Sequence, residues 1–138
     1  MKGSDGKYWL YGCYTGVFGN NYSVIFLCKA ENAEGPYRYE DMLVVSGGNW
    51  GLVPNAIDPQ IFFDAENRMW MTYGSFYGGI RILELDPATG LRKDGYTFAM
   101  FREKKLSRGQ YYGKRILTTT NAEGSVVAFH RGVPVYEG

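Results

Sequence analysis

Residues 55–63 read NAIDPQIFF and are the most informative part of the sequence for the fold. An acidic residue, Asp58, stands just before the apolar run from Ile61 to Phe63, and such a run is typical of a buried β-strand. Pro59 biases Asp58 toward an extended backbone, so its carboxylate is expected at the mouth of that strand. Placing a charge beside an apolar core costs free energy unless the charge is paired or has a chemical role. Asp58 is therefore a candidate for acid or base chemistry.

The composition favours a modest all-β protein. The chain has 138 residues, 17% of them aromatic and 19 of them glycine, which is typical of short strands joined by tight turns. A net charge of +1, from 15 basic and 14 acidic residues, gives no electrostatic basis for a nucleic-acid partner or an anionic membrane. No metal-ligand spacing, membrane-length apolar run or signal peptide is visible. We therefore expect no metal and no cofactor.

Hydrophobic patterns predict eight strands and little helix. The strands are expected near residues 7–14, 22–30, 37–45, 57–64, 68–75, 79–86, 114–118 and 124–130. The polar and basic segment 91–113 is expected to form a weak strand and a surface loop. If residues 15–21 form a hairpin loop, Cys13 lies opposite residues near 23, away from Cys28, so a disulfide is not expected.

An internal repeat organises these strands. The sequence GKYWLYG at 6–12 resembles NRMWMTYG at 67–74, which places Trp9 and Trp70 61 residues apart. The sequence NAEGSVVAF at 121–129 resembles the opening stretch, so Glu123 corresponds to Asp58, 65 residues earlier. A repeat made only of strands suggests four-stranded propeller blades, whose innermost strands line a central channel. Both acids would then project into the channel mouth.

On this interpretation the chain covers about two blades of a propeller. Residues 1–54 form part of one blade, residues 55–120 a complete blade, and residues 121–138 the start of the next. A propeller needs at least about four blades to close, so we expect the chain to be a fragment. Exposed blade edges invite strand pairing between chains, so self-association is also expected.

Taken in order, these residues resemble glycoside hydrolase family 43, and within it the arabinanases. The resemblance rests on NAIDP at 55–59, WMTYGSFYGGI at 70–80 and LELDP at 83–87, with YTGVFGNNYSVI at 14–25 upstream. It implies a five-bladed β-propeller that hydrolyses O-glycosidic bonds with inversion. The implied substrate is arabinan or another plant polysaccharide containing arabinose or xylose.

The resemblance also implies three catalytic acids. Asp58 matches the aspartate that tunes the pKa of the general acid, and Glu123 matches the general acid itself. The general base would lie on a blade before residue 1, so the chain is expected to be inactive alone. From the residues themselves, a surface role for Glu123 and an acid role for Glu137 stay open as alternatives.

The implied partner is an oligo- or polysaccharide, held by aromatic stacking and by hydrogen bonds to sugar hydroxyls. The residues expected to make these contacts are Asn55, Phe18, Ser75, Phe76 and Tyr77. Three alternatives remain: a xylosidase or arabinofuranosidase of the same family, a non-catalytic carbohydrate-binding propeller, and a purely structural propeller piece.

Overall fold

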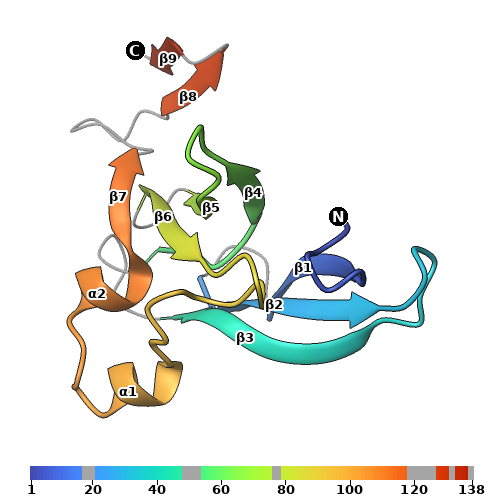
Figure 1. Cartoon of the computed structure of the whole chain (residues 1–138). Helices are drawn as coiled ribbons and strands as arrows, with labels where there is room; N and C mark the ends of the chain where they lie inside the picture. Colours follow the sequence, from blue (N-terminus) through green and yellow to red (C-terminus); the bar gives the residue numbers. More distant parts are fainter. Residues whose placement is uncertain (17–20, 48–53, 76–78, 118–126, 131–132, 137–138) are drawn as a thin grey trace.

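Short antiparallel strands make up most of the chain (Figure 1). The computed structural model describes all residues except 17–20, 48–53, 76–78, 118–126, 131–132 and 137–138. Its elements are β1 (Tyr8–Thr15), β2 (Ser23–Ala30), β3 (Arg38–Ser46), β4 (Gln60–Phe63), β5 (Met69–Ser75), β6 (Gly79–Leu85), α1 (Phe98–Arg102), α2 (Arg108–Tyr112), β7 (Lys114–Leu117), β8 (Val127–His130) and β9 (Val133–Tyr136). The predicted all-β class is therefore confirmed.

The strands form separate sheets, and within each sheet the paired strands are consecutive in the sequence. One sheet has the order β1-β2-β3, a second has the order β4-β5-β6-β7, and β8 pairs with β9. Figure 1 shows the first two sheets side by side, with the two short helices near the end of β3 and the start of β7. The second sheet is an antiparallel meander of four strands, which is the arrangement of a propeller blade.

A shared core joins the two sheets. Along β5 from Met69 to Tyr73, and at the end of β6 from Leu83 to Leu85, buried side chains alternate with half-buried ones, because successive residues of a strand point to opposite faces. The core cluster takes Trp9, Ile25, Leu27, Leu43 and Val44 from the first sheet, Met69, Met71, Tyr73, Leu83 and Leu85 from the second, Ala56 from between the sheets, and Tyr111 and Tyr112 from α2. The two sheets therefore stabilise each other through one apolar interior.

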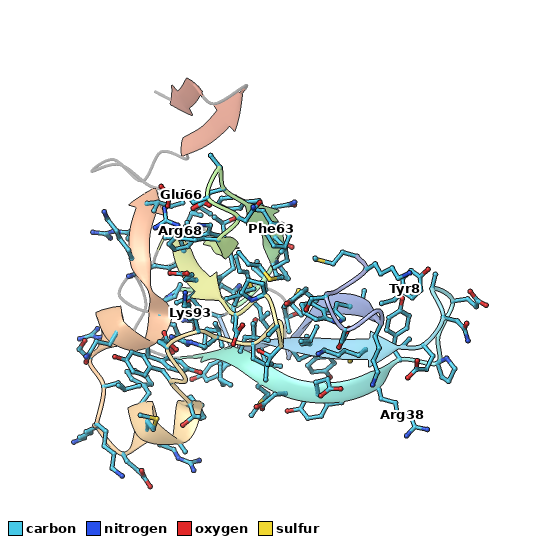
Figure 2. The ribbon with its side chains drawn as sticks, in the orientation of Figure 1. Tyr8, Arg38, Phe63, Glu66, Arg68 and Lys93 are labelled. Atoms are coloured by element: carbon cyan, nitrogen blue, oxygen red, sulfur yellow. The ribbon has the colours of Figure 1, made fainter. Side chains whose placement is uncertain are left out.

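The predicted repeat has a structural counterpart in an aspartate beside each tryptophan. Trp9 Nε1 donates a hydrogen bond to Asp5, and Trp70 Nε1 donates one to Asp64, both at 2.9 Å. A cation completes each group: Lys29 lies 4.4 Å from the Trp9 ring centroid, and Arg68 lies 5.5 Å from that of Trp70. Figure 2 shows Arg68 and Glu66 together at the turn that leads into β5.

The strand that follows Asp58 is less buried than its sequence predicts. Strand β4 begins at Gln60 rather than near residue 57, and it lies at the edge of its sheet. Phe62 and Phe63 are 39% and 49% exposed. The prediction of a core strand was wrong because an apolar run identifies a strand but not whether both of its faces are covered.

Segment 91–113 also differs from the prediction of a weak strand and a loop. It holds α1 and α2, each of five residues. Thr97 caps α1, and Ser107 forms a capping box with Gln110 at the start of α2. These caps satisfy backbone N–H groups at the helix starts. Strand β9 was not predicted either.

The two cysteines are far apart in the register of the first sheet. Cys13 lies opposite Ile25, and Cys28 lies opposite Leu10. The intervening three rungs span roughly 10 Å, beyond the reach of a disulfide. Both thiols are free in the structure.

Candidate active site

The segment that carries Asp58 runs between β3 and β4. Within this segment, Pro54, Asn55 and Ala56 are buried, whereas Asp58 is exposed. Within the described part of the chain, no hydrogen bond or ion pair engages the Asp58 carboxylate. The segment therefore presents an accessible carboxylate, and the residues just before it are held in the protein interior.

Buried hydroxyl groups from the first sheet provide that anchor. Ser23 Oγ, at the start of β2, donates to Asn55 Oδ1 at 2.6 Å. Ser46 Oγ, at the end of β3, accepts from the Ala56 backbone N–H at 2.9 Å and donates to the Asn21 carbonyl at 2.7 Å. Both serines are 6% exposed. Buried polar groups that are satisfied in this way rigidify their surroundings, so the segment has a defined path.

Asp58 adopts a left-handed backbone conformation with φ of 52°. The predicted extended conformation was therefore wrong. Aspartate is among the few residues that visit this region readily, because its short polar side chain can interact locally. Non-glycine residues held at positive φ are concentrated at functional sites, where the surrounding structure maintains the strain.

The second sheet contacts the same segment through Gly74 at the end of β5. Its N–H donates to the Ile57 carbonyl at 3.0 Å. Gly74 has φ of 114°, and a Cβ there would lie 2.5 Å from the Gly79 carbonyl oxygen. Only glycine permits this close approach of β5 and β6. The backbone next to Asp58 is therefore anchored from both sheets.

A cation lies at the same end of the second sheet. Arg81 follows Ile80, which pairs with Gly74, and its Nη1 donates to the Gly113 carbonyl at 3.1 Å. Burial lowers the pKa of Arg81 from its ordinary value. A guanidinium stays protonated even so, and a positive charge is therefore held between β6 and the end of α2.

The structure locates some of the predicted site residues and leaves others outside its description. Asp58 and Asn55 lie in the anchored segment. Ser75 is the last residue of β5, and its backbone follows that of Gly74. The remaining ones lie outside the described residues: Phe18, Phe76, Tyr77 and Glu123. Ser23 and Ser46 were not identified from the sequence as anchors of this segment. The signal in the sequence was a serine at the start of one strand and another at the end of the next, where the two strands pair.

Among the described residues, no group of three His, Cys, Asp or Glu side chains is arranged to hold a metal ion. No helix in the described part is long and apolar enough to cross a bilayer.

The family model of glycosyl hydrolases family 43 matches residues 1–133. An extracellular endo-α-(1→5)-L-arabinanase of Thermotoga petrophila is 34% identical over 96% of this chain and 28% of its own length. An extracellular endo-α-(1→5)-L-arabinanase 2 of Bacillus subtilis is 33% identical, with the same two coverages.

A solved structure agrees with these sequence matches. The crystal structure of the Thermotoga petrophila endo-1,5-α-L-arabinanase superposes with a TM-score of 0.71 at 33% identity, covering 95% of this chain and 30% of that one. The chain thus spans less than a third of the length of each of these relatives. Its fold is part of the five-bladed β-propeller of these enzymes. The chain belongs to family 43 of the glycosyl hydrolases.

Proposed function

We propose that this chain supplies two of the three catalytic carboxyl groups of an inverting arabinan hydrolase. Asp58 is the pKa modulator, and Glu123 is the general acid. The observation that carries the proposal is the exposed Asp58 carboxylate on a left-handed residue, whose segment is anchored by Ser23 and Ser46. Membership of family 43 supports the class of reaction.

The proposed step breaks one glycosidic bond with one water molecule. The Glu123 carboxyl transfers its proton to the leaving glycosidic oxygen as the bond from that oxygen to the anomeric carbon breaks. A base removes a proton from a water molecule that attacks the anomeric carbon from the opposite face. Acid and base stand roughly 6.5–9.5 Å apart in inverting enzymes, to leave room for that water.

The role of Asp58 follows from its charge. A nearby carboxylate disfavours ionisation of a second carboxyl group, so an ionised Asp58 raises the pKa of Glu123. The acid then stays protonated and can donate at the pH of the reaction. Asn55 is buried, and its Oδ1 accepts from Ser23, so we assign it to holding the segment in place.

The proposed substrate is α-1,5-linked arabinan, since the Thermotoga petrophila and Bacillus subtilis relatives described above are named endo-α-(1→5)-L-arabinanases. Phe18, Phe76, Tyr77 and Ser75 are proposed to contact the sugar chain. No residue among the 138 matches the general base that the family resemblance implies, so the chain alone is expected not to hydrolyse arabinan.

A chimera tests the proposal directly. Residues 1–138 replace the matching segment of the Thermotoga petrophila arabinanase, which then supplies the base. The chimera should hydrolyse linear arabinan, and Asp58→Asn should lower kcat. Glu34→Gln, in the exposed turn between β2 and β3, is the matched control and should leave kcat unchanged.

Other outcomes identify the alternatives. A folded chimera that binds arabino-oligosaccharides without turnover would favour a non-catalytic binding propeller. Faster hydrolysis of aryl xylosides than of linear arabinan would favour a xylosidase. Turnover of arabinan by the isolated chain, abolished by Asp58→Asn, would contradict the assignment of the base to another part of the propeller.

A further inference from the structure

A second concave site lies away from the segment that carries Asp58. It is a cavity of about 420 Å³ between β3 and the connection from Leu91 to α1, and Tyr111 of α2 completes its wall. Its aromatic lining comes from Tyr96, Phe98 and Tyr111, and its charged side chains include Asp41 and Arg102. A cavity of this size is within the range that holds small ligands. We name it the outer cavity.

The outer cavity and Asp58 lie near opposite ends of β6. Gly74, which bonds to Ile57, pairs with Ile80 near the start of β6. Arg92, which lines the outer cavity, bridges to Leu85 at the other end of that strand. Five residues of strand span roughly 17 Å. The two places therefore lie at opposite ends of the second sheet.

The wall of the outer cavity is preformed by buried polar contacts. Arg92 is 7% exposed and pairs with Asp94 at 3.0 Å. Its guanidinium also donates to the carbonyls of Leu43 at 3.2 Å and Gln110 at 3.3 Å, which ties β3 to α2. Because these bonds are made within the chain, a ligand would not have to order the wall on binding.

Aromatic packing fixes the other side. The Phe101 and Tyr111 rings stack with centroids 4.9 Å apart and planes 7° apart, and Phe98 lies 6.1 Å from Tyr111. Arg102 lies over the Phe98 ring at 5.6 Å. Rings held in this way offer fixed apolar surface at little entropic cost. Among the neighbouring side chains Met42 is 48% exposed, so the opening is accessible.

The charges of the outer cavity favour a neutral ligand. Asp94 neutralises Arg92, and the exposed Asp41 and Arg102 carry opposite charges. A carboxylate accepts hydrogen bonds, and a guanidinium donates them in a planar fork. Together with the aromatic lining, these groups match a ligand with hydroxyl groups on one side and C–H groups on the other, as in a sugar.

We propose that the outer cavity binds a short segment of neutral oligosaccharide outside the active site. The choice of arabinose units rests on the proposed function, whereas the binding itself requires no catalysis. Asp41 and Arg102 engage sugar hydroxyls, and Tyr96 and Phe98 contact sugar C–H faces. A second binding site for the polymer would raise the local concentration of substrate at the enzyme.

NMR titration of the 138-residue chain with α-1,5-arabinotetraose tests the proposal. Backbone amide signals of Gly95, Thr97, Ala99 and Arg102 should shift with saturation. Asp41→Asn and Arg102→Gln should each weaken binding roughly tenfold, since each removes a charge-assisted hydrogen bond. Lys93→Ala is the control, because Lys93 is exposed near this connection, does not line the cavity and should leave the affinity unchanged (Figure 2).

The outcomes separate this proposal from the catalytic one. Asp58→Asn should leave these shifts unchanged even though it lowers kcat in the chimera. An inactive chimera with saturable binding in the outer cavity would overturn the proposed function alone. Absent shifts, an unchanged affinity in both variants, or tighter binding of tetragalacturonate than of arabinotetraose would overturn the outer cavity as a neutral sugar site.

Discussion

Ser23 Oγ lies 2.6 Å from Asn55 Oδ1, and this buried hydrogen bond joins the first sheet to the segment that presents Asp58. Ser46 makes the parallel link to Ala56. The candidate catalytic residue is exposed, while the groups that set its position are buried. The position of the Asp58 carboxylate therefore depends on hydroxyl groups that need not contact the substrate.

Removing the Ser46 hydroxyl should destabilise the chain. Ser46→Ala leaves the Ala56 N–H and the Asn21 carbonyl without the partner that each has now. A buried group left unsatisfied costs about 1–3 kcal/mol, and urea unfolding should show a loss of that size. The control is Ser4→Ala, at an exposed hydroxyl, which should change stability by less than about 0.5 kcal/mol. Equal losses in the two variants would contradict the anchoring role.

Gly74→Ala should destabilise the chain through a steric clash as well as backbone strain. A Cβ at this position would lie 2.5 Å from the Gly79 carbonyl oxygen, at φ of 114°. We expect a loss of about 2 kcal/mol or more in thermal or urea unfolding. Gly95→Ala separates the two causes, because Gly95 has φ of 70° but no atom within 4 Å of its Cβ position. If both variants lose the same amount, the clash contributes nothing.

The pH dependence of stability should include a contribution from Asp64. Hydrogen bonds from Trp70 and from Arg68, together with backbone N–H groups, lower the pKa of Asp64 below its ordinary value of 3.8. A lowered folded-state pKa stabilises the fold above the unfolded-state pKa, and this stabilisation is lost as the pH falls toward the folded-state pKa. Wild type should therefore exceed Asp64→Asn in urea midpoint at neutral pH.

The difference between the two proteins should shrink as the pH falls below about 4, toward about 2. Glu66→Gln, at the same turn, is the control and should follow the wild-type profile closely, because its carboxylate is exposed and accepts only one contact from Arg68. A wild-type to Asp64→Asn difference that stays constant from neutral to acidic pH would contradict this assignment.

The exposed side chains of β4 should promote self-association. Strand β4 lies at the edge of its sheet, and Phe62 and Phe63 are 39% and 49% exposed. An open apolar edge strand is a template for pairing with another chain, and a lysine there opposes pairing. Sedimentation velocity should show association that increases with concentration and decreases in Phe63→Lys. A monomer at every concentration would contradict it.

Much of the fold could be predicted because the hydrophobic patterns were strong. Strands β1, β2, β3, β5 and β6 begin and end within about two residues of the expected limits, since apolar and aromatic residues are concentrated in them. The two helices were missed because five residues show no helical period. Their signals were the caps Thr97 and Ser107, which also resemble ordinary loop residues.

The candidate site was only partly predictable. Asp58 could be found from its context, but its left-handed backbone could not, because Pro59 suggested the extended region instead. The anchors Ser23 and Ser46 depend on contacts between segments far apart in the sequence. The aspartates beside Trp9 and Trp70 were missed for a different reason. They lie only four and six residues before the tryptophans, but the spacing of the repeat shows that a tryptophan recurs and not which side chain it bonds to.

The catalytic role of Asp58 is tested by the pH profile of kcat for arabinan hydrolysis by the chimera, with and without Asp58→Asn. We expect the substitution to lower kcat by roughly a hundredfold, within the range for loss of acid catalysis, and to change KM little. We also expect the alkaline limb to move to lower pH, because Glu123 loses the neighbouring charge that keeps it protonated. An unchanged kcat with an unmoved alkaline limb would contradict a catalytic role for Asp58.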